Sequence, residues 1–271
     1  MEGQVPKEKK PVGLIVTVII LALAVAGLGA FITVMLLTQN SGSGSSNSGT
    51  TAIETKPEDK PEDKPEDKPE EKDNSNIVKP SAENGNIGDH VRGNSKSKVL
   101  VVEYADPQCP GCAQMMPIMN EVYKKYKDDV AFVYRHYPLS YHVNGKNSAI
   151  AVEAAGKQGY FWEMLTTVFS NQSAWQSLSG TSLVNKFVDL FKTASSNKGD
   201  ADKFKEDLSG SDVAKKVEFD SALGKEAQIG ATPTIMINGK DIDFTSSYTK
   251  STIDLIEEAI DTEIARQGVK L

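Results

Sequence analysis

The chain has 271 residues, and its 37 acidic and 30 basic side chains give it a net charge of −7 at pH 7. No basic patch indicates nucleic-acid binding, and much of the negative charge lies in one repetitive tract, so the net charge says little about the partners of the folded part. The first third of the chain differs in composition from the rest and must be set aside before domains are counted.

A long apolar segment follows a short basic N-terminus. Residues 13–37 contain no charged side chain and consist mainly of Val, Ile, Leu and Ala. As a helix they would span about 37 Å, enough to cross a hydrocarbon core of about 30 Å. The segment is longer than the apolar region of a cleaved secretory signal, so we expect an uncleaved, single-pass anchor in the cell membrane. Lysines at 7, 9 and 10 precede it, which predicts a cytoplasmic segment 1–12 and an extracytoplasmic position for everything that follows.

Residues 38–83 are predicted to form a disordered linker. Its first part is almost all Ser, Gly, Asn and Thr, and its second part repeats the motif Lys-Pro-Glu-Asp between Lys56 and Lys72. A proline at every fourth position removes helical hydrogen-bond donors and clashes with the preceding turn, so the charge spacing cannot build a helix. We therefore interpret the repeat as an extended spacer between membrane and domain.

The globular part is predicted over residues 84–271. Val99–Ala105 is a nearly continuous apolar run, as expected for a strand that is covered on both faces. Pro110 suits the first turn of a helix, and apolar side chains continue at helical spacing as far as Tyr126. Val130–Tyr134 is a second apolar strand. A strand–helix–strand unit of this size predicts two parallel strands with a right-handed crossover.

The remainder is predicted to contain a helical insertion at about 144–223, followed by a hairpin and a last helix. Asn238-Gly239 is a strong signal for a two-residue turn between a strand at Thr234–Ile237 and a partner at Lys240–Phe244. The expected helices of the insertion are Lys146–Lys157, Phe161–Asn171, Ser182–Thr193, Ala201–Leu208 and Asp212–Leu223. The expected buried side of the last helix consists of Ile253, Leu255, Ile256, Ala259, Ile260 and Ile264.

Cys109 and Cys112 are the only cysteines, and they lie between the first strand and the first helix. Two thiols separated by two residues at this position are typical of a thiol–disulfide redox site. The unsatisfied N–H groups of the helix N-terminus favour a negative sulfur on Cys109, which is therefore the predicted nucleophile, whereas Cys112 resolves the mixed disulfide. Glu103, on the preceding strand, either lies under the helix and assists proton transfer or faces solvent at the strand end.

The residues around this pair resemble the DsbA-like family of exported thiol–disulfide oxidoreductases, which have a thioredoxin-like α/β fold. Residues 102–112, VEYADPQCPGC, match the strand and redox motif of that family, including a glutamate six positions before the first cysteine. Further similar segments are 134–139, 158–162 and 230–234, and the resemblance extends from about Asp89 to Gln267.

The resemblance implies a function for several residues and a partner. Pro110 and Gly111 would form the redox dipeptide, Pro233 would be cis, and Thr232 would offer backbone hydrogen bonds to a bound substrate. It also implies an integral-membrane partner, DsbB-like or vitamin K epoxide reductase-like, that reoxidises the enzyme, and it implies no cofactor. The family's strongly oxidising members have a histidine in the dipeptide; Gly111 stands there in this chain, which weakens the expectation of a very oxidising potential.

Four alternatives compete with this prediction. A structural disulfide would close too short a loop to stabilise a domain of this size appreciably. A copper or zinc site would join Cys109 and Cys112 to His136 and His142, but the spacing does not match a compact zinc finger. An adhesive ectodomain would leave the paired cysteines without a role. A reductase or isomerase uses the same residues, so only the reduction potential separates it from the oxidase of exported proteins that we predict.

Overall fold

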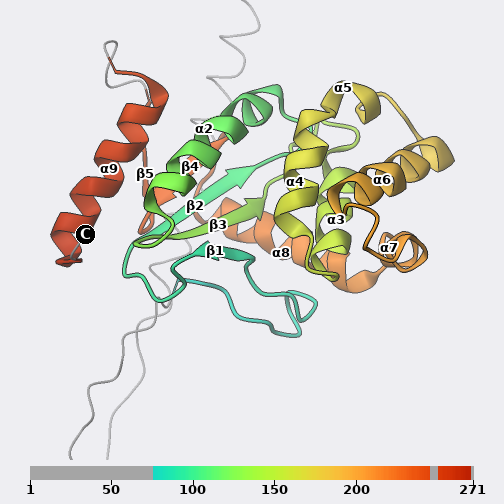
Figure 1. Cartoon of the computed structure of the whole chain (residues 1–271), viewed down its shortest axis with the longest axis horizontal. Helices are drawn as coiled ribbons and strands as arrows, with labels where there is room; N and C mark the ends of the chain where they lie inside the picture. Colours follow the sequence, from blue (N-terminus) through green and yellow to red (C-terminus); the bar gives the residue numbers. More distant parts are fainter. Residues whose placement is uncertain (1–75, 245–249, 270–271) are drawn as a thin grey trace, which may run out of the picture. The chain divides into compact units, whose positions relative to one another are not determined.

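The computed structural model describes residues 76–244 and 250–269, and Figure 1 shows their arrangement. The predicted cytoplasmic segment, the membrane anchor and most of the linker lie outside these residues. Within them, no helix combines the length and the apolar composition needed to cross a bilayer.

A five-stranded mixed sheet forms the centre of the domain. The strands lie in the order β1-β3-β2-β4-β5, and β2 and β3 are parallel whereas the other neighbours are antiparallel. Their bounds are β1 Val91–Gly93, β2 Leu100–Ala105, β3 Ala131–His136, β4 Thr234–Ile237 and β5 Lys240–Asp241. Every residue of β2 and β3 is buried, as the apolar runs predicted. The predicted parallel strand–helix–strand unit is therefore confirmed.

Two helices cover one face of the sheet. Helix α2 spans Pro110–Tyr126 and helix α9 spans Thr252–Gln267, and both pack on Val101, Phe132 and Ile235. The methionines of α2, at positions 115, 116 and 119, are buried in the core, as their helical spacing predicted. In α9, Ile256, Ile260 and Ile264 are buried, whereas the other apolar side chains predicted for that side are only partly covered.

The opposite face carries the alternate side chains of the same strands. Leu100, Val102 and Tyr104 form an apolar cluster there, because successive side chains of a strand point to opposite faces. Leu223 and Ala227, at the end of helix α8 (Ser211–Glu226), pack against this cluster.

The helical insertion gathers beyond the carboxyl ends of β2 and β3 (Figure 1). It has its own aromatic core, in which Trp175, Phe187 and Phe191 are almost completely buried. Its helices are α3 Gly145–Gly156, α4 Phe161–Ser170, α5 Gln172–Trp175, α6 Gly180–Ala194, α7 Ala201–Asp207 and α8 Ser211–Glu226. All five predicted helices are confirmed, with ends that differ by up to three residues.

Three short elements were predicted wrongly or were missed. Strand β1 has only three residues and α5 only four, too few to show a period in the sequence. Strand β5 has two residues instead of the predicted span Lys240–Phe244. The turn itself forms as predicted, with positive φ angles of 47° at Asn238 and 78° at Gly239.

Candidate active site

Cys109 is the N-cap residue of α2, where the strand β2 has just ended. Pro110 occupies the first turn, which has no acidic side chain, and the carbonyl of Cys109 accepts the first helical hydrogen bond, from the N–H of Ala113 at 3.1 Å. The N–H of Cys109 donates to the carbonyl of Asp106 at 2.9 Å. The sulfur therefore lies at the positive end of a 17-residue helix, with no side-chain carboxylate in that turn to oppose a negative charge.

Cys112 lies one turn further into α2. Its side chain has no exposure to solvent, whereas Cys109 retains 8%. Burial raises the pKa of the Cys112 thiol well above its ordinary range, and the nearby Cys109 and Glu103 raise it further. Both cysteines are free thiols in the structure. The two sulfurs thus have different environments, one at the surface of the site and one beneath it.

The loop before β4 meets the redox pair from the other side. The Thr232–Pro233 peptide bond is cis, as the family resemblance implied. The carbonyl oxygen of Thr232 accepts a hydrogen bond from the thiol of Cys109, with 3.4 Å between sulfur and oxygen. A Cβ atom added at Gly111 would lie 3.5 Å from the ring of Pro233, which is an ordinary contact. The dipeptide and this loop are therefore in contact, and the dipeptide has space for a side chain.

Glu103 lies beneath helix α2. Its strand neighbour Val101 packs against α2 and α9, and because Glu103 is two residues further along it points to the same face. The residue is 5% exposed, so of the two alternatives that the sequence leaves open for Glu103, the position under the helix is the one observed. Burial raises the pKa of Glu103 to about 7, and the positive charge of Arg92 limits the rise. A buried carboxyl that can gain or lose a proton near neutral pH therefore lies behind the cysteines.

Asp106, for which the sequence predicts no separate role, joins two loops at the site. Its buried carboxylate accepts hydrogen bonds from the backbone N–H groups of Gln108 and Leu139, each at 2.8 Å. His142 Nδ1 lies 2.7 Å from the same carboxylate. An aspartate three residues before a helix-capping cysteine is the local signal that could have indicated this role.

Gln172 connects the insertion to the redox loop. Its side-chain amide, on α5, donates to the carbonyls of Pro107 at 3.0 Å and of Cys109 at 3.2 Å. Because these partners are more than 60 positions apart in the chain, no local pattern could have predicted the contact.

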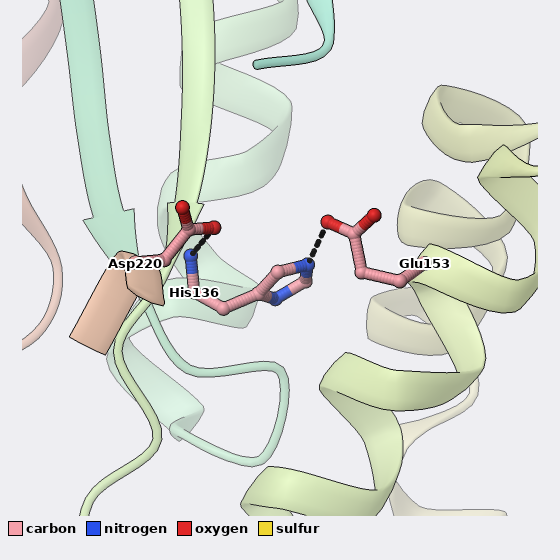
Figure 2. A group of neighbouring side chains, drawn as sticks. All are labelled: His136, Glu153 and Asp220. Atoms are coloured by element: carbon pink, nitrogen blue, oxygen red, sulfur yellow. Dashed lines mark hydrogen bonds and ion pairs between the residues drawn. The ribbon is translucent and has the colours of Figure 1, made fainter. Parts of the chain in front are cut away.

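The cysteines do not meet the histidines that the metal hypothesis assigned to them. Within residues 76–244 and 250–269, the potential ligands that come together are His136, Glu153 and Asp220 (Figure 2). Their four carboxylate oxygens already have partners: those of Glu153 bond to the His136 and His90 rings, and those of Asp220 to the ammonium of Lys216 and the N–H of His136.

This cluster is a buried network of hydrogen bonds and ion pairs, in which the Nδ1 atom of His136 has no hydrogen-bond partner among the described residues. Burial alone would raise the pKa of Glu153, but the charges and hydrogen bonds of His90 and His136 bring it below its ordinary value. A bound metal ion would have to displace hydrogen bonds and the buried ammonium of Lys216. The arrangement therefore fits a structural network between β3, α3 and α8 better than a metal centre.

Comparison with known proteins relates this domain to a protein family. The protein-family model described as Thioredoxin matches residues 85–261. Among curated proteins, the chain is 33% identical over 155 residues to the Na(+)/H(+) antiporter NhaA 1 of Mycolicibacterium gilvum, covering 56% of this chain and 24% of that protein. It is 35% identical over 153 residues to NhaA 3 of Salinispora tropica, covering 56% of this chain and 22% of that protein. The chain thus spans about a quarter of the length of these relatives, and the matched part is the thioredoxin-like domain.

Solved structures give a more complete match. BdbD from Bacillus subtilis is 28% identical with a TM-score of 0.56, and the alignment covers 70% of this chain and 97% of that one. The α-DsbA1 protein of Wolbachia pipientis is 23% identical with a TM-score of 0.52, covering 66% of this chain and 92% of that one, and this second likeness supports the fold alone.

Proposed function

The chain belongs to the thioredoxin family, as a thioredoxin-fold oxidoreductase that resembles BdbD, and we propose that it is an oxidase that introduces disulfide bonds into exported proteins. The observation that carries the proposal is the asymmetric pair: Cys109 caps a helix and is slightly exposed, whereas Cys112 is buried and resists ionisation. A substrate can therefore attack the sulfur of Cys109, whereas the sulfur of Cys112 can be reached only from within the domain.

The proposed reaction starts from the Cys109–Cys112 disulfide. A substrate thiolate attacks the sulfur of Cys109, a substrate–Cys109 disulfide forms, and the bond to Cys112 breaks. Cys112 leaves as a thiolate and takes a proton, which the Glu103 carboxyl beneath the helix can supply. A second substrate thiolate then attacks the substrate sulfur, the substrate disulfide forms, and Cys109 leaves as a thiolate at the helix N-terminus. Two electrons have passed from the substrate to the enzyme.

The remaining predicted site residues have supporting roles in this proposal. Pro110 begins the helix at the position where a missing N–H costs nothing, and Gly111 leaves the approach to Cys109 free of a side chain. Thr232, whose carbonyl lies against the Cys109 sulfur, would bind the backbone of a substrate beside it, with Pro233 shaping that loop.

The cellular setting is part of the proposal as well. The apolar segment 13–37 would anchor the chain in the membrane with the catalytic domain outside the cytoplasm, where disulfides persist. These 271 residues contain no second cysteine pair that could reoxidise the first. We therefore propose an integral-membrane reoxidising partner, DsbB-like or vitamin K epoxide reductase-like.

The reduction potential of the purified protein tests the proposed direction. Equilibration with glutathione buffers should give a potential above about −200 mV, more oxidising than thioredoxin at roughly −270 mV. The reduced protein should also unfold at higher urea concentration than the oxidised protein, because the helix N-terminus stabilises the Cys109 thiolate. Gly111→His should raise the potential further, since a Cβ fits there and an imidazolium beside Cys109 favours its thiolate.

A potential near that of thioredoxin, together with higher stability of the oxidised protein, would instead indicate a reductase. Full absence of exchange with reduced, unfolded substrate proteins would rule out an oxidoreductase of either direction.

A further inference from the structure

Arg92 is a partly buried cation on the same side of the sheet as Glu103. It lies on the edge strand β1, opposite Phe132 of β3 in the antiparallel register. Because directly opposed residues point to the same face, Arg92 shares the face on which Phe132 packs beneath α2. Glu103 points to that face from β2, so the arginine and the carboxyl both lie under the redox helix.

Aromatic and polar side chains hold the guanidinium in place. It lies 4.4 Å from the ring centre of Tyr123 and 4.2 Å from that of Trp162, both within the range of cation–π attraction. Nη1 donates to the side-chain oxygen of Asn120 at 2.9 Å. Tyr123 and Asn120 belong to α2, whereas Trp162 belongs to α4 of the insertion. The charge is therefore fixed between the core of the domain and its insertion.

The groups that act on Glu103 are of two kinds. Cys112 of α2 and Tyr134 of β3 lie near it and, when ionised, would add negative charge. Arg92 of β1 is the cation among the described residues whose charge favours the ionised carboxylate, and Glu103 in turn favours the charged guanidinium. Burial lowers the pKa of Arg92 to about 10, which leaves it positive at neutral pH.

The buried surroundings strengthen the effect of the Arg92 charge on Glu103. The Oε1 atom of Glu103 and the Nε atom of Arg92 are both buried and have no hydrogen-bond partner among the described residues. In a site of low polarity a charge acts more strongly than in water, since little solvent screens it. Without Arg92, the effect of burial on Glu103 would be unopposed.

We propose that Arg92 is a positioning residue for the redox reaction, which sets the pH at which Glu103 exchanges a proton with Cys112. The proposal rests on the proposed function, because it assigns Arg92 to the proton transfer that accompanies disulfide exchange. Trp162 links the effect of Arg92 on Glu103 to the insertion. Its ring packs against the guanidinium of Arg92, so a shift of α4 relative to α2 would change the surroundings of that charge.

The test compares Arg92→Met and Arg92→Lys with the unchanged full-length protein, all in the reduced state. The Glu103 carboxyl is titrated by carbon-13 NMR in glutamate-labelled protein, with Glu103→Gln to assign its resonance, and disulfide exchange is followed over the same pH range. Arg92→Met should move the Glu103 midpoint upward by one pH unit or more, a tenfold increase in proton affinity, and the exchange profile should move with it. Arg92→Lys keeps the charge and should move the midpoint less.

Two further variants complete the design. Arg266→Met removes a cation from α9 that pairs with Glu263, and it should leave the Glu103 midpoint unchanged. Trp162→Leu keeps Arg92 but removes one aromatic wall, so it should raise the midpoint by a smaller amount; it replaces Arg92→Met if that protein does not fold.

An unchanged Glu103 midpoint in Arg92→Met, or in Trp162→Leu where only that variant folds, would overturn the inference. The NMR titration does not depend on activity. An inactive protein with a movable midpoint would therefore refute the proposed function but not the electrostatic coupling of Arg92 to Glu103.

Discussion

Cys109 and Cys112 are chemically identical side chains in unlike surroundings. Burial raises the pKa of Cys112 far above neutral pH, whereas Cys109 lies at the helix N-terminus with some exposure. We predict that iodoacetamide modifies Cys109 first in the reduced protein at pH 7, because the thiolate is the reacting species. Cys109→Ser should abolish exchange, and Cys112→Ser should accumulate disulfides with substrate proteins.

Mass spectrometry of the alkylated peptide and of trapped substrate adducts checks both statements. Urea-unfolded protein is the control. Its two thiols are equally accessible to iodoacetamide, so Cys109 and Cys112 should be labelled to the same extent. Preferential labelling of Cys112 in the folded protein would reverse the two assignments.

Glu103 should make the stability of the domain depend on pH. Its pKa rises from an ordinary 4.5 to about 7, so between these values the unfolded chain releases a proton that the folded protein keeps. The free energy of unfolding therefore falls as the pH rises through this window. The Glu103→Gln variant has no carboxyl at this position, so its free energy of unfolding does not fall in this way. We predict that its free energy of unfolding exceeds that of the unchanged protein by up to about 3 kcal/mol at pH 8 and by little at pH 4.5.

Urea denaturation of both reduced proteins at the two pH values measures this difference. Glu121→Gln is a matched control, because Glu121 is on the exposed side of α2, and it should change stability little at either pH. A stability difference for Glu103→Gln that does not grow with pH would contradict the raised pKa of this carboxyl.

At the level of elements, the β4–β5 turn also ties the sheet to neighbouring segments. The side chain of Asn238 accepts from the N–H of Leu100 at 2.8 Å and donates to the carbonyl of Lys98 at 2.9 Å and to Glu263 of α9 at 2.6 Å. Asn238→Ala should lower the free energy of unfolding by about 2 kcal/mol, through lost hydrogen bonds and a positive φ that alanine disfavours.

Chemical denaturation of the variant gives this value. Asn197→Ala is the comparison, because Asn197 also has a positive φ, of 60°, but lies in the exposed turn after α6. An equal loss in the two variants would show that the backbone angle alone accounts for the effect.

At the level of the whole molecule, the proposed anchor and linker would hold the domain outside the cytoplasm. We predict that protease added to sealed protoplasts or spheroplasts removes the domain that contains Cys109, because the lysines before residue 13 favour a cytoplasmic N-terminus. Lysed cells and a cytoplasmic marker protein are the controls. A domain that resists protease in sealed cells and is digested only after lysis would refute the predicted location.

Local patterns in the sequence were sufficient to predict the elements that carry the reaction. The redox pair at a helix start, the parallel strands, five insertion helices and the Asn238-Gly239 turn all depend on residues close together in the chain, where spacing and backbone preference act directly. Elements of two to four residues, such as β1, β5 and α5, have no period to detect, so their presence or length could not be predicted.

The electrostatics of the site depend on tertiary packing. Whether Glu103 faces solvent or the core depends on the register of β2 and on the helices that cover it, and burial then raises its pKa. The contact of Gln172 with the redox loop and the position of Arg92 beneath α2 depend on segments that meet only when the insertion packs. Which groups can react is a property of residues and their local backbone, so the sequence is enough to predict it. The protonation of those groups follows only from the fold, because charge energies depend on burial and on neighbours distant in the chain.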